Sequence, residues 1–244
     1  EDLKKLSTEQ VTLLEKEYKG FVRNGALLDE GSKNELRNID AKLAQLSLRF
    51  GENILADTQN YQLHIEDEKK LKGLPVSVIE MAKFNAKNKN KKGWIFTLDY
   101  PSYVPLITYA EDREIRKKIC LAYSKRGFQE NENNNSKIIL EIITQRQKRS
   151  ILLGYNSHAD FVLEERMAKS VKNVNDFLDD LTEKAKPYAK KEWEAMELFA
   201  RENFNLKDLE KWDSAFVSEK LKESELQLNE QELKPYFQLD QVLN

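Results

Sequence analysis

The sequence contains few of the residues on which several common kinds of protein depend. Among its 244 residues are one cysteine, two histidines, eight glycines and five prolines. The single cysteine, Cys120, leaves no partner for an internal disulfide and favours a reducing, intracellular compartment. No apolar run approaches the roughly 20 residues that a membrane-spanning helix needs, and no signal-peptide pattern is present. These absences argue against a disulfide scaffold and against a membrane partner.

Charge is plentiful but balanced. Charged residues make up 34% of the sequence and apolar residues 40%, and the formal net charge is −2. Such a chain has no general attraction for nucleic acid or for anionic membranes. Together with the low glycine and proline content, this balance predicts a soluble, mainly helical protein with solvated outer faces.

Motifs that carry catalytic chemistry are also missing. There is no Gly-x-Ser-x-Gly and no glycine-rich phosphate loop. A zinc hydrolase needs imidazoles and carboxylates that converge on the metal, yet neither His64 nor His158 has a second histidine nearby. Asp160, Glu164 and Glu165 follow His158, but Asp160 is only two positions away and poorly placed on a helix to share its face. We therefore read His158 as an ordinary first-turn residue.

Other candidate residues also favour a structural interpretation over a chemical one. Cys120 stands between Ile119 and Leu121, as a core residue would. The run Lys87–Lys92 followed by Trp94 suggests nucleic-acid contact, but it is short and rich in asparagine, so we favour a solvated loop before a strand. Paired carboxylates are adjacent in sequence and diverge on a helix, which predicts solvated faces: Glu111 and Asp112, Glu164 and Glu165, and Asp179 and Asp180. The sequence thus predicts no catalytic, cofactor-binding or metal-binding residue.

Helical periodicity dominates the middle of the chain. Ser136 precedes one pattern that Gly154 ends, Ser157 with Asp160 begins a short second one, and Ser170 begins a third. The third pattern continues for about eight turns, with apolar residues at Val174, Phe177, Leu178, Leu181, Ala185, Tyr188, Met196 and Phe199. We expect its apolar stripe to be buried against the other elements.

The remaining patterns complete a mainly α fold, a helical bundle of long antiparallel helices with a small two-stranded β insert. Residues 1–60 predict a helical hairpin packed like a coiled coil, with starts at Ser7 and Asp29. Residues 61–100 predict two strands around a helix from about Pro75. We expect residues 101–205 to form the helical core, with a helix after Asp112 and an asparagine-rich loop. Residues 206–244 predict a helix at Trp212 and a capping box at Asn229.

Four segments resemble a known family. They are GWIFTLDYPSY at 93–103, LLGYNSHADF at 152–161 followed by MAKS at 167–170, Trp212-Asp213, and YFQLDQVL at 236–243. In this order they are similar to the zinc oligopeptidases related to thimet oligopeptidase and neurolysin. Within that family the segments look most like those of bacterial peptidyl-dipeptidases.

The resemblance implies a long, two-lobed, mainly helical peptidase whose deep channel admits short peptides. The family's zinc ligands belong to a His-Glu-x-x-His motif and a later Glu, none of which is present here. The resemblance thus implies the non-catalytic, N-terminal part of a zinc metallopeptidase, forming one wall of the channel. Zinc belongs to the full-length parent, and we expect this chain alone to bind none and to be inactive.

Two hypotheses follow for the chain itself. In the first, its partners are short peptides and the missing catalytic half, and its exposed apolar surface favours self-association. In the second, it is a freestanding helical interaction protein that has lost the catalytic half. A nucleic-acid module is a distant third. We expect a cytoplasmic location, although loss of an N-terminal signal would leave the periplasm open.

Overall fold

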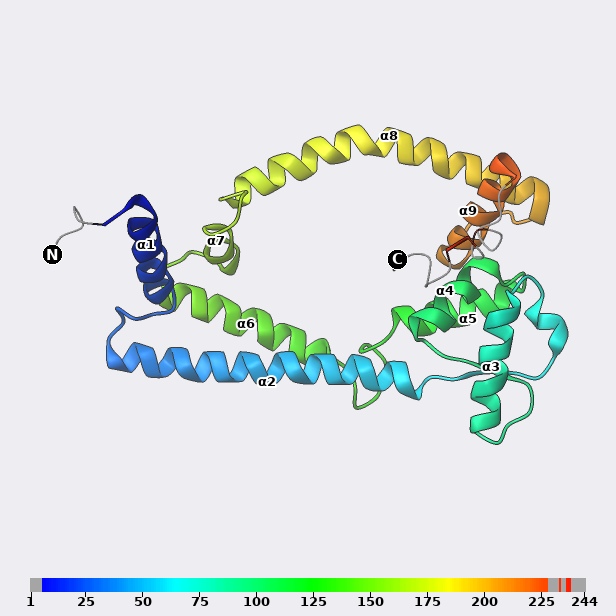
Figure 1. The fold of residues 1–244 in the computed structure, drawn as a ribbon, viewed down its shortest axis with the longest axis horizontal. Coiled ribbons are helices and arrows are strands. Elements are labelled where there is room, and N and C mark those ends of the chain that lie inside the picture. The colour runs from blue at the N-terminus through cyan, green and yellow to red at the C-terminus, as the bar shows by residue number, and fades with distance from the viewer. Residues whose placement is uncertain (1–5, 228–232, 234–235, 238–244) are drawn as a thin grey trace. The chain divides into compact units, whose positions relative to one another are not determined.

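A computed structural model describes residues 6–227, 233 and 236–237 of the chain. These residues form long helices and one small sheet (Figure 1), which confirms the mainly α fold with a two-stranded insert. The elements are α1 (Thr8–Arg23), α2 (Glu30–Asn60), β1 (Leu63–Ile65), η2 (Glu68–Leu71), α3 (Val76–Asn88), β2 (Trp94–Phe96), α4 (Tyr100–Tyr109), α5 (Arg113–Ser124), α6 (Ser136–Leu152), α7 (His158–Leu163), α8 (Val171–Phe204) and α9 (Lys211–Leu226).

The helix starts follow local side-chain chemistry. The Ser7 hydroxyl accepts a hydrogen bond from the Gln10 amide, and the Gln10 side chain returns one to the Ser7 amide, forming the predicted capping box. Asp112, Ser157 and Ser170 accept from the first turns of α5, α7 and α8. The predicted capping box at Asn229 and most of the segment 236–243 lie outside the described residues.

The chain divides into two compact units, each built from two separate stretches. The first unit contains Glu1–Glu52 and Asn134–Leu181, and the second contains Asn53–Asn133 and Thr182–Asn244. Helices α2 and α8 each contribute to both units.

In the first unit, α6 runs antiparallel along the first part of α2 (Figure 1). Three contacts fix this register. The Asn135 side-chain Nδ2 donates to the Phe50 carbonyl, Lys42 pairs with Glu141 at 3.0 Å, and the Arg149 Nε donates to Asp40 at 2.7 Å. Leu36, Ile39, Leu46 and Ile138 are buried in this unit. The antiparallel partner of α2 is thus α6.

The predicted coiled-coil packing of α1 on α2 is not what the structure shows. Both helices exist with a short connection, but none of the residues of α1 is buried. Its apolar residues Leu14, Tyr18 and Phe21 are 48%, 60% and 65% exposed. Instead, the C-terminal end of α1 binds α7 through Arg23, which donates to the Phe161 carbonyl at 2.7 Å. The spacing of apolar residues along α1 correctly predicted an apolar face, but it did not predict which element α1 would contact.

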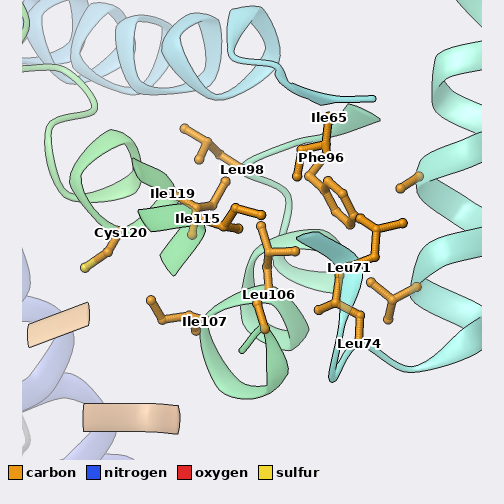
Figure 2. Packing of buried hydrophobic residues seen from close by; sticks show 13 residues of the cluster. Ile65, Leu71, Leu74, Phe96, Leu98, Leu106, Ile107, Ile115, Ile119 and Cys120 are labelled. Atoms are coloured by element: carbon orange, nitrogen blue, oxygen red, sulfur yellow. The ribbon is translucent and has the colours of Figure 1, made fainter. Parts of the chain in front are cut away.

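The second unit contains the main apolar core of the described residues. Strands β1 and β2 pair with each other, as the sequence predicted, and the structure shows that they are antiparallel, with Leu63 opposite Phe96 and Ile65 opposite Trp94. Helix α3 packs on β2, and α4, α5 and α9 pack on one another. Figure 2 shows side chains from the sheet, η2, α4 and α5 converging on this core, among them Ile65, Leu71, Phe96, Leu98, Leu106, Ile115 and Ile119.

Candidate functional site

The two histidines are separated and serve local structure. His64 lies on β1 in the second unit, where its Nε2 donates to the Lys92 carbonyl at 2.6 Å. His158 begins α7 in the first unit. Within the part of the chain that the structure describes, no three His, Cys, Asp or Glu side chains gather closely enough to hold a metal ion. The described residues therefore do not fit a catalytic zinc site.

His158 lies in a cationic, aromatic environment. Its Nδ1 is buried and has no hydrogen-bond partner among the described residues. Burial first, and then the charges of Arg146 and Arg149, lower the pKa of His158 below its usual 6.5. The neighbouring Phe161 ring has the Arg23 guanidinium 4.5 Å from its centroid and that of Arg149 at 5.0 Å. These surroundings therefore disfavour the charged, protonated form of His158.

Glu164 and Glu165 are exposed, as predicted, and both also form ion pairs. Glu164 pairs with Arg23 and accepts a 2.6 Å hydrogen bond from the Tyr155 hydroxyl, and Glu165 pairs with Lys19. These contacts join α7 to α1. The adjacency of the two carboxylates in the sequence correctly showed that they would diverge. It did not show that α1 would supply Lys19 and Arg23 as their ion-pair partners.

The other sequence candidates occupy structural positions. Cys120 is 3% exposed in the core, as predicted. Burial is the first cause that raises the pKa of the nearby Tyr103 to about 12. Residues 87–92 are exposed, and Trp94 is half-buried on β2. Glu111 pairs with Lys72 at 2.8 Å, Asp112 caps α5, and Asp179 and Asp180 are exposed on α8.

A buried ion-pair network between α5 and α9 was missed at the sequence level. The Asp213 carboxylate is 0% exposed and accepts from Arg116 Nη2 at 2.8 Å and from Arg113 Nη2 at 2.6 Å. Arg116, itself 1% exposed, also donates to the carbonyls of Ala110, Glu111 and Trp212. In the sequence, only the Trp212-Asp213 pair pointed to this part of the chain, and it did not indicate which residues Asp213 would bind.

Opposing effects act on the Asp213 carboxyl group. Burial favours the neutral acid, but the hydrogen bonds from Arg113, from Arg116 and from the Glu210 amide outweigh it and hold the pKa of Asp213 below 3.8. Each nitrogen of the Arg116 guanidinium donates to Asp213 or to a backbone carbonyl, and both oxygens of Asp213 accept hydrogen bonds from Arg113, Arg116 or the Glu210 amide. With its charges already satisfied inside the fold, the network is suited to joining α9 to α5, not to proton transfer.

A second buried carboxylate organises the asparagine-rich loop. Asp57, 4% exposed near the end of α2, accepts from the Gly127 amide at 2.7 Å. The side-chain amides of Asn131 and Asn133 donate to the same carboxylate at 3.1 and 2.8 Å. Although burial opposes it, these three hydrogen bonds lower the pKa of Asp57. The polar loop read from the sequence is therefore tied down by one residue that precedes it by about 70 positions.

The most unusual surface is the apolar stripe of α8, which we define as Val174, Phe177, Leu178, Leu181, Ala185 and Tyr188. The sequence predicted that other elements would bury the whole apolar face of α8. This prediction is wrong for the stripe, whereas Met196 and Phe199, farther along the same face, pack against the core residues Ala200, Phe216 and Val217. Phe177 is 65% exposed, Leu181 50% and Tyr188 69%, and Ala200 is the one buried residue that α8 has. Exposed apolar surface of this extent is typical of an interaction site.

No helix among the described residues is both long enough and apolar enough to cross a bilayer.

Comparisons with known proteins identify what the chain is similar to. The family model described as peptidase family M3 matches residues 106–244. Oligopeptidase A of Haemophilus influenzae is 36% identical over 98% of this chain, and that of Escherichia coli is 32% identical over 98%. The dipeptidyl carboxypeptidase of Escherichia coli is 27% identical over 98%.

These matches confirm the resemblance to the metallopeptidase family that the sequence segments suggested. They also show higher identity to oligopeptidase A than to the dipeptidyl carboxypeptidase, toward which the segments had pointed. The chain spans about a third of the length of these relatives, 36% for the two oligopeptidases and 35% for the dipeptidyl carboxypeptidase.

Proposed function

Because the chain belongs to peptidase family M3, we propose that it forms the non-catalytic part of a zinc metallopeptidase that hydrolyses short peptides. The observation that carries this proposal is the family match over residues 106–244 in a sequence that has no His-Glu-x-x-His motif. Metal binding and water activation then belong to residues outside this chain.

The proposed role of the chain is to build one wall of the substrate channel. Long helices such as α2 and α8 suit a wall, because a helix of about 30 residues spans roughly 45 Å. The buried Asp213 network supports this role by holding α9 against α5 without exposing a reactive group. The exposed faces of α1 and α8 supply apolar surface against which the catalytic part packs.

For the substrate class, we propose oligopeptides. Support comes from the higher identity to proteins named oligopeptidase A, 36% and 32%, than to the one named dipeptidyl carboxypeptidase, 27%. The cytoplasm is the proposed location, and a relative named probable cytosolic oligopeptidase A is 31% identical over the whole chain.

The test measures hydrolysis of an internally quenched short peptide. The 244-residue chain is compared with the polypeptide that its complete gene encodes, each with zinc and each with a chelator. The proposal predicts chelator-sensitive hydrolysis by the longer polypeptide and none by the 244-residue chain. A folded protein substrate, which a narrow channel excludes, serves as the control and should remain intact. Chelator-sensitive turnover by the 244-residue chain alone would contradict the proposal.

A second candidate function, that of a freestanding helical interaction protein, is favoured by the exposed stripe of α8. The two candidates differ in the gene. A reading frame that stops directly after Asn244 supports the interaction protein, and a frame that continues into a His-Glu-x-x-His motif supports the peptidase.

A further inference from the structure

Asn24 and Gly25 form the one Asn-Gly pair in the sequence. Asn24 is exposed at the C-terminal end of α1, directly after Arg23, the last residue of the helix. An asparagine followed by glycine is chemically labile, because glycine has no side chain to keep its backbone nitrogen away from the asparagine side-chain amide. Asn24 is therefore a candidate site of spontaneous covalent modification.

The fold requires glycine at position 25. Its φ of +86° lies in the left-handed region, which residues with a side chain rarely adopt. A Cβ atom at Gly25 would also lie 2.6 Å from Cδ2 of Leu36 and 3.0 Å from Cδ1 of Leu28. Leu36 is buried and has little room to shift. The residue after Asn24 is thus the one that hinders its cyclisation least.

In the folded chain, hydrogen bonds keep the two reacting groups occupied. The Gly25 amide donates to the Val22 carbonyl at 2.9 Å, as in the Schellman motif that ends many helices. The side-chain Nδ2 of Asn24 donates to the Gly20 carbonyl, also at 2.9 Å. Cyclisation therefore requires a local opening that breaks both hydrogen bonds.

The preceding residue opposes such an opening. The Arg23 guanidinium donates to the Phe161 carbonyl at 2.7 Å and pairs with Glu164, so it ties this end of α1 to α7 and the turn after it. The Arg23 side chain is only 12% exposed. Hydrogen bonds in which one partner is charged are stronger than those between neutral groups. The contact with α7 thus helps to keep the end of α1 closed around Asn24.

We propose that Asn24 is a deamidation site that reacts when the C-terminal end of α1 opens. Hydroxide removes the proton from the Gly25 nitrogen, which attacks Cγ of Asn24. A bond forms between this nitrogen and Cγ, the bond from Cγ to Nδ2 breaks, and Nδ2 takes a proton from water and leaves as ammonia. Water then opens the succinimide ring at either of its two carbonyls, which gives aspartate or isoaspartate. No atom is oxidised or reduced.

Both products weaken the end of α1. Aspartate at position 24 places a negative charge at the C-terminal end of the helix, where the helix dipole disfavours it, and removes the donor to the Gly20 carbonyl. Isoaspartate adds a methylene group to the main chain and so displaces the Gly25 amide from the Val22 carbonyl. Deamidation should therefore loosen the junction of α1 with α7. The proposal does not depend on the peptidase function.

The first experiment follows deamidation of every asparagine by peptide mapping and mass spectrometry during incubation in mildly alkaline buffer. The wild-type chain is incubated folded and in guanidinium chloride. Asn24 should be the first asparagine to react in denaturant, and its reaction should be at least about tenfold slower in the folded chain. Asn24→Gln is the control and should give no product at position 24. Equal rates at Asn24 in the two conditions, or faster reaction of another asparagine in denaturant, would overturn the proposal.

The second experiment tests the contact with α7. Arg23→Gln removes the charge that binds Phe161 and Glu164, so it should raise the rate in the folded chain at least about threefold and leave the rate in denaturant unchanged. Arg201→Gln changes an exposed arginine of the second unit and should alter neither rate. In Arg23→Gln, an unchanged rate in buffer, or one as fast as in denaturant, would contradict local protection by Arg23.

Discussion

Replacing Asp213 with asparagine is the sharpest test of how the second unit is held together. The substitution preserves the size of the side chain but removes its charge. Arg116, whose side chain is 2% exposed, is then left buried without a counter-charge. Leaving one partner of a buried pair uncompensated costs about 3–5 kcal/mol. Arg113 contributes less to this loss, because its side chain is 39% exposed and water screens it.

Urea unfolding followed by tryptophan fluorescence measures this loss, since Trp94 and Trp212 both belong to the second unit. Asp208→Asn is the matched control: its side chain is exposed, and the variant should stay within about 0.5 kcal/mol of wild type.

The pH dependence gives an independent check. The pKa of Asp213 is lowered in the folded chain, so the unfolded chain binds the proton more tightly. The stability due to this group is present above the unfolded pKa of about 3.8 and is lost as pH falls through the folded value. The difference between wild type and Asp213→Asn should therefore shrink below pH 4. A variant as stable as wild type at neutral pH, or a difference that does not change with acid, would refute the reasoning.

Three further substitutions test other parts of the fold. Asp57→Ala removes the acceptor for the Gly127, Asn131 and Asn133 amides, so limited proteolysis should cut this variant faster within residues 127–133. The control is Asp179→Ala, which alters an exposed carboxylate. Equal cleavage rates for the two variants would show that Asp57 does not secure the loop. His158 has a lowered pKa, so the wild-type chain should lose stability as pH falls below 6.5, and His158→Gln should lose less stability over that range. Matching pH profiles for the two proteins would count against a lowered pKa of His158 in the folded chain. Gly93→Ala places a methyl group against the Ile65 carbonyl at a φ of +80° and should lower the free energy of unfolding by at least about 1 kcal/mol in a thermal melt. Gly51→Ala, whose new methyl group would meet open space, should lower it by nothing. Similar melting curves for the two variants would argue against the tight turn at Gly93.

Local features of the fold were predictable from the sequence because they depend on neighbouring residues. A serine or aspartate at Ser7, Asp112 and Ser157 caps a helix through its own first turn, and each did so in the structure. The alternation around Leu63 and Ile95 likewise required only the two-residue period of a strand.

Contacts between distant segments were not predictable in the same way. Asp213 binds Arg116 across 97 positions, and Glu164 binds Arg23 from another helix. An apolar stripe indicates that one face of a helix should be buried, but it does not indicate which element buries that face. The expectation that other elements of the chain would cover the apolar faces was wrong for α1 and for the stripe of α8, but right for Met196 and Phe199. Glu164 is exposed, as expected, but its ion pair with Arg23 was not foreseen.

Candidate chemistry was judged mainly by which residue types stand near one another in sequence, and that judgement was sound for Cys120. The structure added the surroundings of His158 and the exposed stripe of α8, neither of which spacing alone reveals.

The most direct test of the central claim is to read the natural gene beyond the codon for Asn244. The account predicts that the same reading frame continues and encodes a His-Glu-x-x-His motif followed by a further glutamate, the ligand set of a zinc peptidase. A stop codon directly after Asn244 would contradict it and would make the interaction protein the better description of this chain.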